Sequence, residues 1–452
     1  MLSALYLFFG VVFAVLSVVH LVLLTRTVRR LLTPDAPLLQ DQECQPAVVL
    51  LCLRGDDPHL PRTLARLAEL DYPDYRIRIM LDSETDAAGE AIRRVLSPQL
   101  VERFEVRVLT KRFDSCTYKM SAILEGTREL PPGTAVLALL DGDTVLHRSW
   151  LRELATPILR GQAEVVTGNR WYIPERTTLA NLVRYWWSSS ALSLMYVLKL
   201  PFGGTMALRP EIIENEPLRE RIRHAFSEDT TIGQFVTEQG GRVLFQRSLT
   251  INNGEDISLR GFFNFDTRQL LAVRMQHANW TWLGLHGLLS CAWAVYPVLR
   301  GWLPFEPWIV YTFRSLLAGL CLQAFLQDWA VRRILKARGE QPAWWSPWRL
   351  LLSLPALLLL AFLHTAAVIR AFLTRHINWR GVVYRLHGQP PVQVLRDEWA
   401  GTAEADVASR LATDVSDANA RSTADPSPHR LRVVAAIEGA SPAVPVVRTD
   451  GA

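Results

Sequence analysis

The sequence predicts an α/β domain with a mainly parallel sheet, placed between apolar segments that are long enough to cross a membrane. Two observations lead to this prediction. Between about residues 45 and 266, short apolar runs alternate with segments of helical spacing, an order typical of parallel strands joined by right-handed crossovers. Long, almost uncharged stretches lie on both sides of that block, at the N-terminus and after residue 280.

The first element is an N-terminal anchor. Leu2–Leu24 is almost free of charge and is long enough to span the hydrocarbon core at about 1.5 Å per residue. It lacks the basic leading region and the Ala-x-Ala cleavage site of a signal peptide. Arg26, Arg29 and Arg30 follow at once, and basic residues favour the cytoplasmic side. Residues 1–30 are therefore predicted to be a transmembrane anchor with its N-terminus outside.

The block of residues 45–266 opens with strands and helices in turn. Apolar runs predict strands at Ala47–Leu53, Ile77–Leu81, Phe104–Leu109 and Ala135–Leu140. Apolar residues at helical spacing predict helices at Leu60–Leu70 and Ala87–Leu96. Ligands of such sheets bind beyond the carboxyl ends of the strands. The residues that follow these runs are therefore the first candidates for a functional site.

Acidic residues stand at two of these strand ends and again far downstream. Asp82 follows the second run, and Asp141 and Asp143 follow the fourth. Carboxylates at positions i and i+2 point the same way and can hold a hard divalent cation, which neutralises the phosphates of a nucleotide. Glu228 and Asp229 come after a further helix-like segment, where a carboxylate is free to act as a base. This order indicates a sugar transferred from a nucleotide beside a membrane.

Apolar stretches of two kinds follow. Within and after the domain, helices that lie in the membrane interface are predicted at 178–200 and 262–280. Further transmembrane helices are predicted at about 281–302, 308–329 and 350–373. Tryptophans gather at the ends of these spans, where amphipathic rings favour the interface.

The charges near the C-terminus leave the membrane topology open. Four crossings return the C-terminus outside, yet four basic residues follow the last span, namely Arg370, Arg375, Arg380 and Arg385. A re-entrant or interfacial helix in place of the last span is the alternative. The tail, residues 396–452, is rich in Ala, Asp, Ser, Thr and Pro and is predicted to be disordered.

The composition bounds the partners. The net charge of +5 is modest and the basic residues cluster beside the apolar segments, which indicates contact with anionic lipid. The sequence contains no zinc finger or RNA-binding motif, so no nucleic-acid partner is expected. The five cysteines have no CxxC spacing and are interpreted as reduced, structural thiols.

Further motifs stand in a fixed order around the acids. They are Leu53–Pro58 (LRGDDP), Leu70–Tyr75 (LDYPDY), Lys119, Gly203–Arg209 (GGTMALR), Glu228-Asp229 and Asn378–Arg385 (NWRGVVYR). With the acids, they make the chain similar to the inverting family-2 glycosyltransferases of type-A fold. The most similar group is the ceramide glucosyltransferases and related bacterial lipid glucosyltransferases. The resemblance covers roughly Leu2 to Leu395 and implies a Rossmann-like mixed sheet.

The resemblance also implies a role for each acidic position. Asp82 would hold the nucleotide base or ribose, and Lys119 would stand near the diphosphate. Asp141 and Asp143 would manage the nucleotide and a divalent metal (Mn²⁺ or Mg²⁺), with Asp143 as the direct ligand. Such an ion stabilises the leaving diphosphate. Asp229 would take the proton from the acceptor hydroxyl, so that one displacement inverts the anomeric carbon.

One element departs from the family pattern. The family has a (Gln/Arg)-x-x-Arg-Trp motif, for which the best register here is Gln276-x-x-Asn279-Trp280. Gln276, Trp280 and Glu228 would then form a lid over the acceptor and the diphosphate. Asn279 cannot supply the positive charge of the family arginine. Arg274 is an imperfect substitute because it lies on nearly the opposite face of the helix from Gln276.

The sequence thus predicts a multi-pass membrane glycosyltransferase with a cytoplasmic catalytic domain, in the inner membrane if the source is bacterial. It would transfer a hexose, glucose first, from a UDP-sugar to the hydroxyl of a membrane lipid. One alternative is a polysaccharide synthase of the same superfamily, against which Asn279 and the small number of spans argue. The other is a catalytically silent membrane protein that binds a nucleotide or a lipid.

Overall fold

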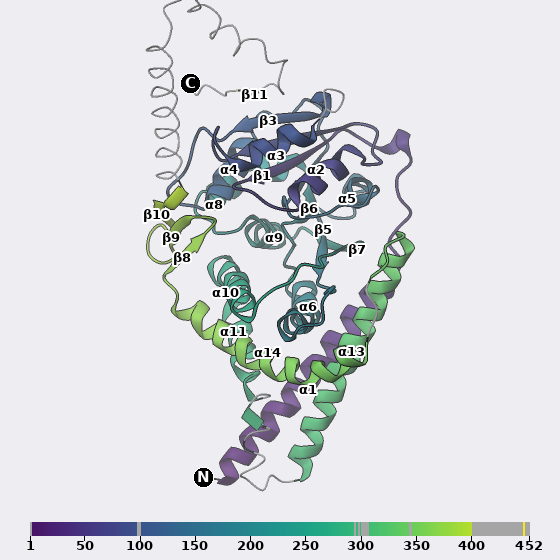
Figure 1. The fold of residues 1–452 in the computed structure, drawn as a ribbon, viewed down its shortest axis with the longest axis vertical. Helices are drawn as coiled ribbons and strands as arrows, with labels where there is room; N and C mark the ends of the chain where they lie inside the picture. The colour runs from purple at the N-terminus through teal and green to yellow at the C-terminus, as the bar shows by residue number, and fades with distance from the viewer. Residues whose placement is uncertain are drawn as a thin grey trace, which may run out of the picture.

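The computed structural model of the protein describes residues 2–96, 101–292, 295–296, 299, 307–342, 346–399 and 446–447. The strands of the main sheet are β1 (Ala47–Leu53), β2 (Tyr75–Leu81), β3 (Phe104–Val108), β4 (Val136–Leu140), β5 (Val165–Trp171), β6 (Thr205–Leu208), β7 (Val243–Asn252) and the two-residue β11 (Val446–Val447). Their order across the sheet is β11-β3-β2-β1-β4-β6-β5-β7 (Figure 1).

The sheet is mixed. β3, β2, β1 and β4 are parallel neighbours, whereas β6 runs antiparallel between β4 and β5, and β7 is parallel to β5. Leu53 pairs with Leu81, and Leu51 pairs with Leu140, so β1, β2 and β4 end near the same edge. The predicted α/β fold with a mixed sheet is confirmed.

Helices cover both faces of the sheet. On one face lie α2 (Leu60–Ala68), α3 (Ala87–Val95) and α5 (Trp150–Leu159), and on the other lie α4 (Tyr118–Gly126), α7 (Pro210–Glu214), α8 (Glu216–Ile222) and α9 (Glu228–Glu238). Short 3-10 turns occur at Asp41–Glu43 and Val101–Arg103. Successive side chains of β1 point to opposite faces: Val49 and Leu51 join the first core, and Val48 and Leu50 join the second. Burial on both faces explains why the strands are continuous apolar runs.

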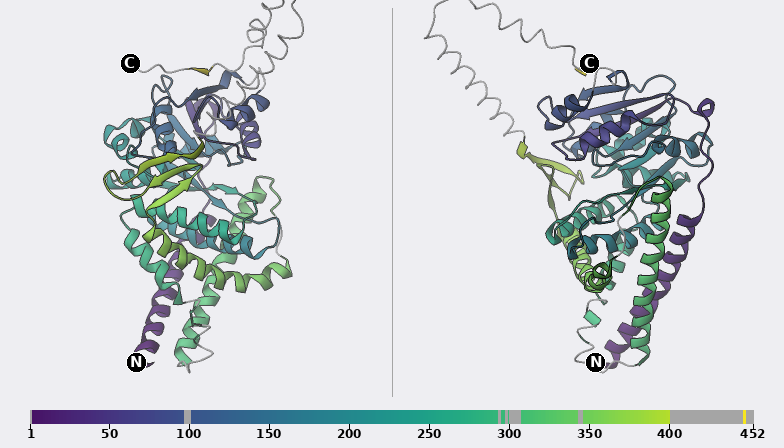
Figure 2. Two further views of the ribbon diagram at one scale, coloured as in Figure 1. Left: turned by 60° about the vertical axis from the view of Figure 1, so that its left-hand side comes forward. Right: turned by 45° about the vertical axis from the view of Figure 1, so that its right-hand side comes forward.

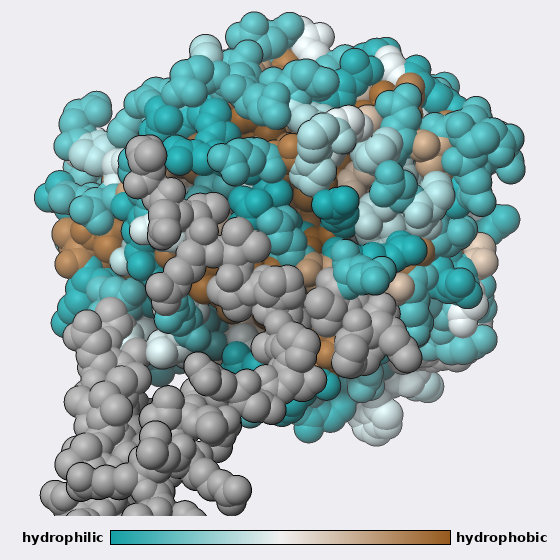
Figure 3. Space-filling model, turned by 90° about the horizontal axis from the view of Figure 1, so that it is seen from above, coloured by the Kyte–Doolittle hydropathy of each residue, from teal (hydrophilic) through white to brown (hydrophobic). Residues whose placement is uncertain are grey.

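Below the sheet, the remaining helices form an apolar layer and a projection. The layer consists of α6 (Leu179–Leu198), α10 (Leu259–Gln276), α11 (Trp280–Leu289) and α14 (Pro347–Leu373). α1 (Leu2–Leu32) and α13 (Pro307–Ala337) lie side by side and project beyond this layer, whereas α14 runs across it beneath α6 and α10 (Figure 2). Seen from the opposite side, the surface is largely hydrophilic (Figure 3).

Three of the described helices are long and apolar enough to cross a membrane, over Ala4–Leu32, Pro307–Ala337 and Pro347–Leu373. The span predicted at 281–302 begins with α11, which has only ten residues. Most of the rest of that span lies outside the described residues. The predicted disordered tail also lies outside them, apart from residues 396–399 and β11.

Arginines connect the ends of these helices to the domain that contains the main sheet. At the end of α13, Arg338 donates to the carbonyls of Ser248 (2.7 Å) and Thr250 (2.7 Å) of β7. At the start of α14, Arg349 donates to Pro174 O (2.7 Å). At the other end of α14, Arg370 donates to Asn264 Oδ1 (2.8 Å) on α10. Both ends of α14 therefore contact the same domain.

A small antiparallel sheet follows α14. It consists of β8 (His376–Trp379), β9 (Val382–Arg385) and β10 (Gln393–Asp397). Asp397 accepts a hydrogen bond from Arg54 just after β1 (2.6 Å), and Arg380 donates to Asp57 (3.1 Å). These contacts fix the small sheet beside the edge where β1, β2 and β4 end.

Candidate active site

The main sheet brings the predicted acidic residues to one edge. Asp82 directly follows β2, and its backbone N–H donates to Leu53 O at the end of β1 (3.1 Å). Asp141 and Asp143 directly follow β4. Asp82 is buried, and its carboxylate accepts from Arg54 and makes a longer ion pair with Arg112 (3.5 Å). These positions agree with the expectation that ligands gather beyond the carboxyl ends of parallel strands.

Lys119, in the first turn of α4, joins two of the acids. Its Nζ donates to Asp141 Oδ1 (2.6 Å) and to Glu228 Oε1 at the start of α9. Burial would lower the pKa of Lys119, but the two carboxylates raise it well above its usual value, so the side chain is a cation. Burial raises the pKa of Glu228 to about 7, against the opposing effect of Lys119.

Asp143 is held by a guanidinium that the sequence did not single out. Arg170 of β5 donates to Asp143 Oδ2 (3.0 Å) and to Oδ1 (2.8 Å), which is the bidentate geometry of a strong ion pair. Burial alone would raise the pKa of Asp143, but Arg170 outweighs it and the pKa falls to about 2. Asp143 is therefore an anion at any physiological pH.

Asp229 lies against the glycine pair that follows α6. Its Oδ2 accepts from the backbone N–H of Gly203 (3.2 Å), and its Oδ1 accepts from Thr230 N (2.6 Å). A Cβ at Gly203 would stand 2.3 Å from Glu228 Oε1, and a Cβ at Gly204 would stand 2.9 Å from Asp141 Oδ2. A side chain at either position would therefore crowd these carboxylates, and at Gly204 it would also meet the ring of Phe202.

Two cavities meet at these acids. The first, here called the polar cavity, has a volume of about 180 Å³ and is lined by Arg54, Asp82, Tyr118 and Arg380, among others. The second, called the apolar cavity, has a volume of about 370 Å³ and extends along α6, α10, α11, α13 and α14, with many leucines in its wall.

The acids divide between the two cavities. Asp82 lines only the polar cavity, whereas Glu228 and Asp229 line only the apolar cavity. Asp141 and Asp143 line both, as does Lys119. The carboxylates thus form the junction between a polar chamber and an apolar one.

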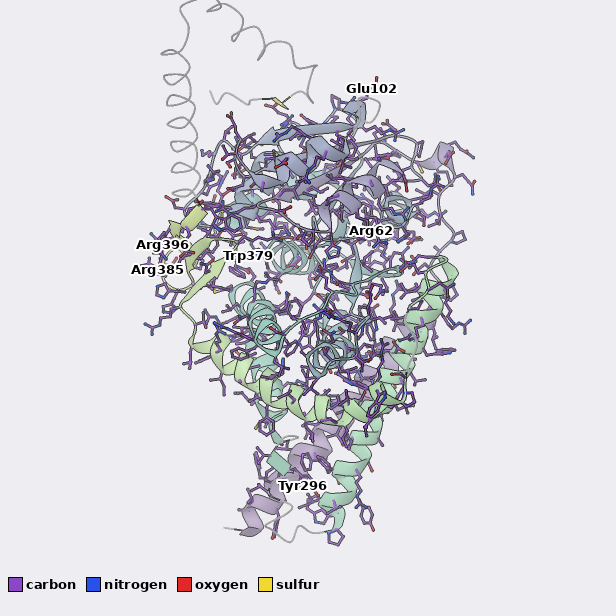
Figure 4. The ribbon with its side chains drawn as sticks, in the orientation of Figure 1. Arg62, Glu102, Tyr296, Trp379, Arg385 and Arg396 are labelled. Carbon is purple, nitrogen blue, oxygen red and sulfur yellow. The ribbon has the colours of Figure 1, made fainter. Side chains whose placement is uncertain are left out.

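Arg268 of α10 is a second cation that the sequence did not single out. It lines both cavities and stacks on the ring of Trp379 at 5.6 Å from the centroid. Trp379 stands on β8, beside α10 (Figure 4). Burial lowers the pKa of Arg268, and Tyr172, Asp141 and Asp143 act on the same guanidinium through its charge. The sequence alone does not indicate that this arginine lies between two cavities, because its surroundings depend on which elements pack against the helix.

Two of the predicted lid residues, Gln276 and Trp280, do not line the polar cavity or the apolar cavity. Gln276, at the end of α10, donates to Ala272 O (3.1 Å) and accepts from Phe226 N (2.8 Å) when its amide is oriented to make both bonds. Trp280 packs in the apolar cluster at the start of α11. In contrast, Arg268 and Gln269 of α10 line the apolar cavity. Gln276 therefore reaches the acids only through the backbone just before Glu228.

Asn279 and Arg274, which stand at or near the motif that differs from the family pattern, both make hydrogen bonds. Asn279 is the residue before α11, and its backbone N–H donates to His277 Nδ1 (3.1 Å). Arg274 donates to Phe372 O at the end of α14 (3.0 Å) and to Leu386 O (3.1 Å). Arg274 thus fixes the C-terminal segment and does not line either cavity.

The carboxylates Asp141 and Asp143 could hold a divalent cation. Among the described residues, no group of three or more His, Cys, Asp or Glu is placed to hold a metal ion by itself. Mg²⁺ commonly takes only one or two carboxylates and completes its shell with water and substrate phosphates, and Mn²⁺ favours the same oxygen ligands. The donor set of these two side chains fits such an ion.

Comparison with known proteins identifies the class. The model of glycosyl transferase family 21 matches residues 9–391. Among solved structures, a mannosyltransferase from Pyrobaculum calidifontis, in complex with GDP-Man and Mn²⁺, is 16% identical, with a TM-score of 0.44 over 81% of this chain and 99% of that one. The S. aureus protein TarS 1-349 is 12% identical, with a TM-score of 0.33 over 76% of this chain and 97% of that one. No curated protein sequence matches. The assignment rests on the family match.

Proposed function

The chain belongs to glycosyl transferase family 21 and is a glycosyltransferase, and we propose that it transfers a hexose, glucose first, from a UDP-sugar to a lipid hydroxyl with inversion. The observation that carries this proposal is the division of the acids between the two cavities. A nucleotide sugar is polar and charged, and a lipid is apolar. An enzyme that joins them needs one chamber for each, with the reacting groups at the junction.

The polar cavity supports binding of the donor. Asp82, at the end of β2, can accept hydrogen bonds from a base or a ribose once Arg54 exchanges its partner. At the junction, Lys119, Arg170 and Arg268 offer positive charge for a diphosphate. Arg268 is the cation that can act in place of the arginine that Asn279 replaces.

A divalent metal, Mn²⁺ or Mg²⁺, fits the same junction. Asp143 and Asp141 would hold it, and when bound it would stabilise the negative charge that builds on the leaving diphosphate. Asp143 is suited to this role because Arg170 keeps it ionised. Arg170 would then shift its hydrogen bonds from Asp143 toward the phosphates.

On the acceptor side, we assign the role of general base to Asp229. It lines the apolar cavity, and the N–H groups of Gly203 and Thr230 orient its carboxylate. A base there can take the proton of a lipid hydroxyl as the hydroxyl attacks the anomeric carbon. Glu228 has a different task in this proposal, because its carboxylate is committed to Lys119.

We further propose that α1 and α13 cross the membrane, while α14 lies in its surface. α14 is long enough to cross, but both of its ends contact the same domain. Its outward face is apolar: Trp348 is 68% exposed, Leu351 64% and Phe372 69%. This arrangement keeps the small sheet and Arg370 on the side of the catalytic domain. The positive-inside rule then supports a cytoplasmic domain.

Purified protein tests the proposal directly. The full chain in detergent is incubated with Mn²⁺ or Mg²⁺, a panel of UDP-sugars and a membrane lipid extract, and the lipids are analysed by mass spectrometry. We expect one new lipid, heavier by one hexose, that is missing with Asp229→Asn. A high-molecular-weight product would instead indicate a polysaccharide synthase. UDP binding without any transfer would contradict the proposed reaction.

A further inference from the structure

The apolar cavity contains a group of histidines that the proposed reaction does not use. His20 of α1, His286 of α11 and His364 of α14 all line this cavity. The rings of His20 and His286 lie 5.7 Å apart between centroids. Three helices that are distant in the sequence thus place imidazoles in a chamber whose wall is otherwise rich in leucine.

His364 has a structural explanation. Its Nδ1 lies 2.8 Å from Asp266 Oδ2, and Trp187 Nε1 donates to the other oxygen of Asp266 (2.8 Å). Asp266 is only 1% exposed, so both of these partners serve to satisfy a buried carboxylate. This network joins α14, α10 and α6 and sets the wall of the apolar cavity.

His20 and His286 do not satisfy a buried carboxylate in this way. His20 Nδ1 lies 2.7 Å from Leu16 O, and because a carbonyl can only accept, Nδ1 carries the proton. The lone pair of His20 is therefore on Nε2 and can accept a hydrogen bond. His286 Nε2 is buried and has no hydrogen-bond partner among the described residues. A buried polar atom without a partner destabilises a protein unless something else satisfies it.

We propose that His20 and His286 form a subsite that hydrogen-bonds a hydroxyl or amide group on the backbone of the lipid acceptor. The inference rests on the proposed function, because it concerns the chamber that would hold the acceptor. His20 Nε2 would accept from an O–H or N–H of the lipid, and His286 Nε2 would gain the partner that it lacks. The enzyme would then prefer lipids that carry such a group in addition to the reacting hydroxyl.

The test compares two acceptors on the full chain in detergent. One is an N-acylsphingosine, which has an amide and a second hydroxyl, and the other is hexadecan-1-ol, which has a single hydroxyl. We expect His286→Leu to lower the ratio of the two kcat/KM values by about threefold to tenfold, the usual effect of one hydrogen bond. His286→Asn, which keeps a polar group, should lose less.

A matched control and two readouts separate the explanations. Leu285→Ala changes the neighbouring, 45% exposed side chain of α11 and should leave the ratio unchanged. UDP affinity, measured by calorimetry, should be the same in every variant. An unchanged ratio in His286→Leu, or an equal loss on both acceptors, would overturn the subsite and leave the proposed function intact. Hydrolysis of the donor without transfer to either acceptor by the unaltered protein would overturn both.

Discussion

The polar cavity and the apolar cavity share Asp141 and Asp143, which follow β4, but the two cavities are otherwise built from different parts of the chain. Loops that directly follow β1, β2 and β4 form much of the polar cavity, together with the small C-terminal sheet. The apolar cavity is lined mainly by α6, α10, α11, α13 and α14, and it meets the sheet at Lys119, Asp141 and Asp143. In the proposed account, the domain contributes the donor site, and the apolar helices complete the acceptor site.

The largest effect should come from Asp229, the proposed base on the apolar side. Asp229→Asn keeps the size of the side chain but removes its ability to take a proton. We expect transfer to fall by about 100-fold to 10,000-fold, with UDP affinity unchanged because Asp229 does not line the polar cavity. Product formation and calorimetry with UDP check the two halves of this prediction. Glu238→Gln, at the exposed end of α9, is the control, and loss of UDP affinity in Asp229→Asn would contradict the division.

Lys119 belongs to both cavities, so its removal should damage the junction itself. Lys119→Met leaves Glu228 buried without its cation, and because the pKa of Glu228 is already about 7, this carboxyl takes up a proton. The loss of folding free energy should therefore be about 1–3 kcal/mol, the cost of an unsatisfied buried polar group. Thermal unfolding in detergent measures the loss. Adding Glu228→Gln to the same chain should restore part of the stability. A single variant as stable as the unaltered protein would show that the pair does not hold α4 to α9.

Arg268 should matter for the donor and less for the acceptor. Arg268→Leu removes the stacked guanidinium, and we expect UDP to bind about tenfold more weakly, which corresponds to roughly 1.4 kcal/mol. The UDP affinity of Arg268→Lys should lie between those of the unaltered protein and Arg268→Leu, because lysine keeps the charge but not the planar shape. Arg62→Leu, an exposed position on α2 (Figure 4), is the control. Equal UDP affinity in Arg268→Leu and Arg62→Leu would exclude a role in binding the diphosphate.

A further prediction concerns the dependence of stability on pH. Burial raises the pKa of Glu228 from its ordinary value of 4.5 to about 7, so the folded protein holds this proton more tightly than the unfolded chain does. Ionising Glu228 therefore costs folding free energy, a cost that grows as pH rises from about 4.5 to about 7 and is constant above that. Between about pH 5 and pH 8, the Tm of the unaltered protein should fall more than that of Glu228→Gln. Parallel pH profiles would contradict the assignment.

Much of the polar side could be predicted from the sequence. Asp82, Asp141 and Asp143 each follow a continuous apolar run, and a strand buried on both faces leaves that local pattern. Arg170 could not be predicted in the same way. Its strand, β5, meets the edge only because β6 inserts antiparallel between β4 and β5, and strand order is not a local property.

The helix α10 contains one residue at the cavities that the motif did not single out. The resemblance implies that Gln276 and Trp280 form a lid over the acceptor and the diphosphate, and this stays a prediction. The part of α10 that lines both cavities contains Arg268, eight residues before Gln276. At 1.5 Å per residue, this separation is about 12 Å along the helix. The apolar cavity escaped prediction for a related reason: the contacts between α6, α10 and α14 depend on how the helices cross, which hydropathy does not encode.

The most direct test of the two-chamber account is to fill one chamber. Ala191→Trp on α6 adds bulk to the wall of the apolar cavity, and Val197→Trp adds the same bulk at a position of the same helix that is 37% exposed and lines neither cavity. Transfer to lipid and affinity for UDP are measured side by side. The account predicts that Ala191→Trp abolishes lipid transfer with UDP affinity unchanged, whereas Val197→Trp retains both. Full lipid transfer by Ala191→Trp would contradict it.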